Sequence, residues 1–63
     1  MTADALISRG TDLRRVLHLV VDAALVADDA IDRGDADALR RGVEIMTAHV
    51  ATIRAHIMEI ADA

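Results

Sequence analysis

Hydrophobic and small residues recur at every third or fourth position along almost the whole chain. In the first half these positions are Leu6, Gly10, Leu13, Leu17, Val20, Ala24, Ala27 and Ile31. In the second half they are Ala36, Leu39, Val43, Met46, Val50, Ile53, Ile57 and Ile60. Alternating steps of three and four keep residues on one face of an α-helix, as in a coiled coil. The pattern predicts two long helices, over residues of about 3–32 and 36–61.

The segment between the two heptad patterns carries residues that end one helix and begin another. Gly34 can adopt the left-handed conformation that closes a helix, and Asp35 can accept hydrogen bonds from the first N–H groups of the next helix. So short a turn, over residues 33–35, makes the helices antiparallel. Thr2 can cap the first helix. A glycine inside a helix costs about 1 kcal/mol relative to alanine, and we expect the first helix to continue through Gly10 despite this cost.

The predicted fold class is therefore all-α, with residues 1–63 forming one antiparallel, coiled-coil-like two-helix hairpin. The core between the two helices is expected to include Leu17, Val20, Val50 and Ile53. Matched around the turn, small residues of one helix face large residues of the other in several layers. Such pairs interdigitate well.

Each helix is predicted to carry a second apolar stripe beside its heptad pattern, and this indicates that one hairpin associates with another molecule. A single helix pair needs only one apolar stripe on each helix, and a further apolar patch on a small protein is an interaction site. Its simplest occupant is another copy, so we expect a homodimeric four-helix bundle. The predicted interface residues are Val16, Leu19, Ala23, Val26, Ile45 and His49.

Length and composition support self-association and exclude several protein classes. A chain of 63 residues forms one domain at most and buries only about 60% of its unfolded surface, so its core is small. There is no cysteine, and hence neither a disulfide framework nor a thiolate metal site. With 54% hydrophobic and 29% charged residues, the chain is too apolar for disorder and too charged for a membrane span.

The charges and the N-terminal segment bear on partners and location. The net charge is −4 and every basic residue is arginine, so there is no general attraction to nucleic acid or anionic lipid. The first residues lack the basic and apolar regions of a signal peptide, and we expect a cytoplasmic protein. Nucleophiles are few and the three glycines are far apart, so we expect neither enzymatic activity nor a cofactor.

The three histidines are the basis of the main alternative, a metal- or haem-binding bundle. His56 and Glu59 are neighbours on one helix face, with Asp12 expected near their level, and such a set can bind a divalent ion. His49 and His56 are seven residues, or about 10.5 Å, apart, so only a dimer could bring two of them to one ion. His18 and His49 are the candidate haem pair, although no aromatic residue is present to line a porphyrin site. The simpler interpretation is histidines that are partly buried and hydrogen-bonded.

Arginines on one flank provide a third interpretation, an RNA-binding regulator. Arg14, Arg40 and Arg54 share this flank, but the negative net charge and the lack of aromatic residues for base stacking argue against it. The preferred hypothesis is a non-enzymatic interaction module that binds and regulates, inhibits or tethers a protein partner. The candidate partner contacts are Val21, Leu25 and Met58.

Overall fold

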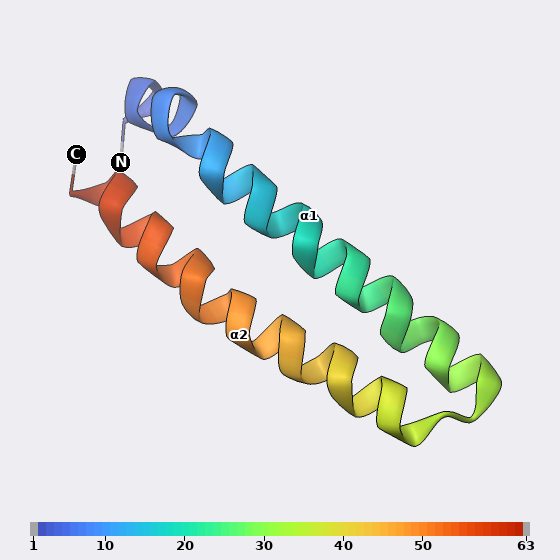
Figure 1. Cartoon of the computed structure of the whole chain (residues 1–63). Helices are drawn as coiled ribbons and strands as arrows, with labels where there is room; N and C mark the ends of the chain where they lie inside the picture. Colours follow the sequence, from blue (N-terminus) through green and yellow to red (C-terminus); the bar gives the residue numbers. More distant parts are fainter. Residues whose placement is uncertain (1, 63) are drawn as a thin grey trace.

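The computed structural model describes residues 2–62 and consists of two helices, α1 (Ala3–Arg33) and α2 (Ala36–Ala61). The helices run antiparallel, with both chain ends at one end of the molecule and the turn at the other (Figure 1). The predicted helical hairpin is confirmed. The molecule measures 44 × 15 × 12 Å, and its radius of gyration is 14.4 Å, against about 10.6 Å for a compact domain of this length. It is a rod with little interior.

Local hydrogen bonds determine where each helix begins and ends. The Thr2 hydroxyl oxygen accepts a hydrogen bond from the Ala5 N–H at 3.1 Å. The Asp35 carboxylate accepts one from the Ala38 N–H at 3.0 Å in the same way. Gly34 has a φ of 67°, in the left-handed region that glycine adopts without steric cost. These caps are the ones that the sequence predicts.

Gly10 lies inside α1, which continues through it without a break. The first turns of α1 are tilted out of line with the rest of the helix (Figure 1, blue). A Cβ atom added to Gly10 would meet only Leu6 Cδ1, at 4.0 Å. Packing within the described chain therefore gives no reason for a glycine at this position.

The two helices meet along a seam that is rich in small residues. Its buried members are Ala5, Val16, Ala23, Ala27, Ala30, Ala38, Gly42 and Ile60. Half-buried members are Leu13, Val20, Leu39, Met46, His49, Ile53 and His56. A Cβ atom on Gly42 would lie 3.2 Å from the Ala23 carbonyl oxygen and 3.2 Å from Ala27 Cβ. The seam thus depends on small side chains that let the two backbones approach closely.

Only one of the two stripes in the predicted heptad pattern lies in this seam. The residues of the other stripe come one position after the residues that are actually buried. Val20 and Ile53 are half-buried, as predicted. The prediction is wrong for Leu17 and Val50, which are 45% and 42% exposed, and Val16 is buried instead. One residue turns a helix by about 100°, so neighbouring stripes point in clearly different directions. Periodicity alone does not choose between two apolar stripes, and the stripe with more alanine and glycine allows the closer approach.

Candidate interaction surface

The seam divides the outside of the rod into two long faces. In an antiparallel pair, the residues that directly follow seam positions such as Val16 and His49 fall on the same side of both helices. We call this side the open face; it comprises Gly10, Leu17, Ala24, Ile31, Ala36, Val43, Val50 and Ile57. The opposite face comprises Asp12, Leu19, Val26, Arg33, Ile45, Thr52 and Glu59.

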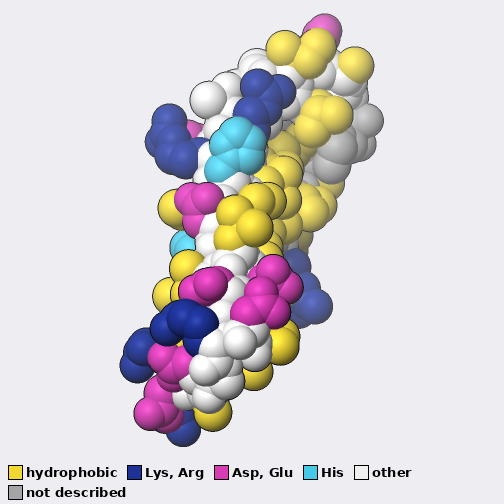
Figure 2. Space-filling model, turned by 90° about the vertical axis from the view of Figure 1, so that its right-hand side faces the viewer, with side chains coloured by type: hydrophobic (Ala, Val, Ile, Leu, Met, Phe, Trp, Pro, Cys, Tyr) yellow, Lys and Arg dark blue, Asp and Glu magenta, His cyan; other side chains and the backbone are white. Residues whose placement is uncertain are grey.

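The open face is apolar along its whole length. It carries no charged residue, and its large side chains are half exposed: Leu17 45%, Ile31 63%, Val43 46%, Val50 42% and Ile57 41%. In the view of Figure 2, hydrophobic side chains gather along one edge of the upper part of the rod, and charged side chains crowd its lower part, toward the end that carries the turn. The sequence pattern detects these residues but assigns them to the core. The alanine and glycine of the neighbouring stripe are the signal that could have separated the two.

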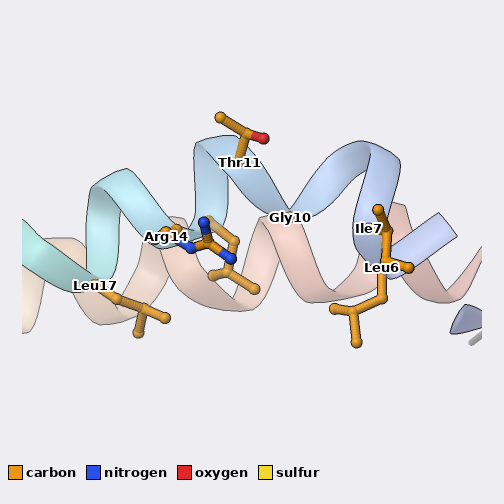
Figure 3. Close-up of a pocket in the computed structure, with 7 residues that line it drawn as sticks. Leu6, Ile7, Gly10, Thr11, Arg14 and Leu17 are labelled. Atoms are coloured by element: carbon orange, nitrogen blue, oxygen red, sulfur yellow. The ribbon is translucent and has the colours of Figure 1, made fainter. Parts of the chain in front are cut away.

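Two shallow hollows lie along this side of the rod. The larger, of about 540 Å³, surrounds Gly10 and is lined by Leu6, Ile7, Gly10, Thr11, Leu13, Arg14 and Leu17. Figure 3 shows Leu6 and Leu17 on either side of the gap that the glycine leaves, with Arg14 between them. The smaller, of about 260 Å³, lies at the turn and is lined by Ala30, Ile31, Gly34, Asp35, Ala36 and Leu39. Each hollow can therefore accept an aliphatic side chain.

The six predicted interface residues lie in two different environments. Val16 and Ala23 are only 9% and 5% exposed because α2 covers them, and His49 is half-buried in the seam. The other three are on the opposite face and half exposed: Leu19 44%, Val26 51% and Ile45 47%. Half of the predicted set thus has little surface left for a second chain.

Charged residues surround the apolar residues of the opposite face. Asp12 lies 3.6 Å from Arg15, and Asp29 lies 2.7 Å from Arg33. Arg33 also lies 3.5 Å from Asp35. These pairs are exposed and contribute little to stability. They do make the opposite face a mixed surface, in contrast to the open face.

The three candidate partner contacts are exposed but do not form one patch. Val21 is 55%, Leu25 63% and Met58 66% exposed. Helical periodicity places Val21 at the edge of the open face, Leu25 on the back of α1 and Met58 on the back of α2. A partner could therefore contact Leu25 or Met58 without covering the open face.

The histidines of the proposed haem pair do not converge. His18 is exposed on the back of α1, whereas His49 is half-buried in the seam. The body of α1 separates the two imidazoles, because His18 points away from α2 and His49 points toward α1. This arrangement gives no shared axial site within one hairpin.

The residues of the proposed metal site form a pair and not a trio. His56 Nδ1 lies 3.7 Å from Glu59 Oε2, as the three-residue spacing predicts. Asp12 pairs with Arg15 instead. Within residues 2–62 there is no group of three or more histidine, cysteine or acidic side chains that could hold a metal ion.

The three arginines of the third interpretation lie along the outer edges of the open face. Arg40 is engaged by Asp37 of its own helix, with 3.0 Å between the guanidinium and carboxylate atoms. Arg14 lines the larger hollow. These side chains border an apolar surface and do not form a basic patch.

Comparisons with known proteins add no family to this description. No family model, no curated protein and no solved structure matches the chain. Over the described residues, neither helix contains a stretch long and apolar enough to cross a membrane.

Proposed function

We propose that this chain is a non-enzymatic protein-interaction module, a homodimeric four-helix bundle that binds a protein partner and regulates, inhibits or tethers it. The observation that carries the proposal is the row of large, half-exposed apolar side chains along the open face. Small proteins rarely expose apolar patches of this kind unless another molecule covers them.

The surface area of the hairpin supports a dimer. The chain exposes 4635 Å², whereas a compact monomer of 6.7 kDa exposes about 3,900 Å². The hairpin thus exposes an excess of about 700 Å² of surface. Each partner in a stable interface buries a similar area, about 800 Å². A lone hairpin also hides only about half of its unfolded surface, less than is usual at this size. A second copy would remove both deficits.

The chemistry of the hollows supports a module without catalytic activity. Their lining is aliphatic and glycine apart from Thr11, Arg14 and Asp35, and the last of these serves as the cap of α2. An aliphatic, open hollow suits packing against another side chain better than it suits a reaction.

Contacts outside the open face remain available for a protein partner. Leu25 and Met58 are among the most exposed large side chains and lie on the backs of the helices. In a bundle closed over the open face, each copy would present them on the outside. Apolar side chains in such positions are the ones that a partner protein would cover.

Two measurements test the proposed function. Light scattering of the full chain as it leaves a size-exclusion column should give a mass of twice 6.7 kDa. A protein captured from the native host counts as a partner only if, once purified, it binds the chain directly in calorimetry. Leu25→Asp should weaken that binding, whereas the control Asp32→Ala, one helical repeat further along the same line of α1, should not. A folded monomer, or a purified chain that binds none of the captured proteins, would contradict the proposal.

A further inference from the structure

We infer that the second copy docks on the open face, with the turns of the two hairpins at opposite ends of the bundle. This inference rests on the proposed dimer and deepens it. It names the face, the orientation and the residues in contact, and it moves the interface away from the stripe of Leu19, Val26 and Ile45 that the sequence favours.

The predicted heptad pattern identifies the face. On α1 it joins seam residues such as Val20 with open-face residues such as Leu17, so its mean direction lies between the two. In a four-helix bundle each helix touches two neighbours, and its apolar stripe points between them, toward the centre. The longest apolar pattern of the chain therefore points where the centre of a bundle closed over the open face would lie.

The distances of the exposed Ile31 side chain and of the hollow at Gly10 from the middle of α1 indicate how the second copy is oriented. Gly10 lies eleven residues before Val21 and Ile31 lies ten after it, which is about 16 Å and 15 Å at 1.5 Å per residue. If two copies of α1 run antiparallel about a two-fold axis at Val21, Ile31 of each copy meets the hollow at Gly10 of the other. Ile31 is 63% exposed, and the hollow has no other occupant in the described chain.

The same axis matches one further pair of a large and a small side chain. Leu17 is brought opposite Ala24, so a large side chain again meets a small one. Such complementary sizes are what close packing requires.

The distribution of charge along the chain also favours a bundle in which the two turns lie at opposite ends. Residues 28–33 of α1 carry three carboxylates against one arginine, a net charge of −2, whereas residues 9–15 carry three arginines against one carboxylate, a net charge of +2. Turns at opposite ends place the acidic segment of one copy beside the basic segment of the other. Turns at the same end would place two acidic segments together, and like charges in contact are unfavourable.

One specific pair follows from this arrangement. Arg14 lies seven residues before Val21 and Asp28 seven after it, so each is brought opposite the other across the two-fold axis. Within residues 2–62 neither side chain takes part in an ion pair of its own chain. Both border the open face and are free to pair between copies.

A matched pair of variants tests the face. Leu17 and Leu19 are 45% and 44% exposed on the same helix, and they differ in the face on which they lie. An unpaired charge buried in an interface is costly, so Leu17→Glu should raise the dimer dissociation constant about 100-fold or more in sedimentation equilibrium. Leu19→Glu should change it less than about threefold, as is usual for a surface substitution. The reverse order would overturn the inference while leaving the proposed dimer standing.

A single cysteine tests the orientation, because the natural chain has none. A disulfide needs the two Cα atoms within about 7 Å. Oxidised Val21→Cys should therefore form a covalent dimer in most chains, and the control Leu25→Cys on the back of α1 should not. If the turns lie at the same end, Val21→Cys will cross-link to Thr47→Cys in a mixture and not to itself, which overturns the orientation. A natural chain that sediments as a folded monomer overturns both this inference and the proposed dimer.

Discussion

The seam and the open face are neighbouring stripes on the same two helices, and they differ in the size of their side chains. Alanine and glycine dominate the buried part of the seam, whereas leucine, isoleucine and valine dominate the open face. Burial of apolar surface contributes about 25 cal/mol per Å². A hairpin that hides its small residues and leaves the leucine, isoleucine and valine side chains of the open face half exposed therefore keeps unused hydrophobic stabilisation on that face. The difference indicates that the small residues let the two helices of the hairpin pack closely, and it is the reason why we propose that the large ones are covered by a second copy.

Enlarging a side chain in the seam should have the largest effect. Gly42→Leu places a side chain where even a Cβ atom would be 3.2 Å from the backbone oxygen of Ala23, which cannot rotate away. We expect the helices to separate and the free energy of unfolding to fall by about 3 kcal/mol or more, as measured by urea denaturation. The control Ala51→Leu, exposed on the back of α2, should change it by less than about 0.5 kcal/mol. Equal effects of the two variants would contradict the close approach at the seam.

Shortening a side chain on the open face should weaken association. Ile31→Ala removes the side chain that we place in the hollow at Gly10 of the second copy, and truncation of a buried isoleucine costs about 2 kcal/mol or more. Because the two-fold axis repeats this contact, we expect the dimer dissociation constant to rise at least about 30-fold, as measured by dilution in a fluorescence or calorimetric assay. Val26→Ala, on the opposite face, is the control and should leave the constant nearly unchanged. A larger effect of Val26→Ala would place the interface on the opposite face.

The two helical glycines give the smallest effect and the sharpest contrast in sign. Alanine favours a helix by about 1 kcal/mol over glycine. At Gly10 a Cβ atom enters open space within one chain, so Gly10→Ala should raise helix content at concentrations where the chain is monomeric. At Gly42 the close contacts with Ala23 and Ala27 should cancel or exceed this gain. In circular dichroism melts, the midpoint of Gly10→Ala should therefore rise and that of Gly42→Ala should stay the same or fall, and a clear rise in both would contradict the close contacts at Gly42.

The elements of the fold could be predicted from sequence because their signals are local. Gly34 ends α1 and Asp35 begins α2 through backbone conformation and a single side-chain hydrogen bond, and both can be inferred from neighbouring residues. The pairing of faces could not be predicted in the same way. Leu17 and Val16 are adjacent, both are apolar, and both continue a repeat of threes and fours. The choice between them depends on how closely two backbones approach, which is a tertiary property.

The candidate surface was likewise predicted only in part. An apolar stripe beyond the needs of one hairpin can be inferred from sequence, and its existence follows from counting apolar positions. Its location cannot, because Leu19 and Leu17 look alike until the seam is known. The predicted metal site was also found only in part. The three-residue spacing of His56 and Glu59 predicts that they are close on one helix, whereas the sequence does not show that the Asp12 carboxylate pairs with Arg15.

The most direct test of the account is a nuclear Overhauser measurement on a mixture of isotope-labelled and unlabelled chains, filtered for contacts between copies. Gly10 and Ile31 are 21 residues apart on one helix, or about 31 Å, so no contact between them can arise within one chain. We expect cross-peaks from the Ile31 methyl groups of one copy to the Gly10 Hα protons of the other. Filtered cross-peaks that connect Leu19, Val26 or Ile45 instead, or no cross-peaks between copies in a folded sample, would contradict it.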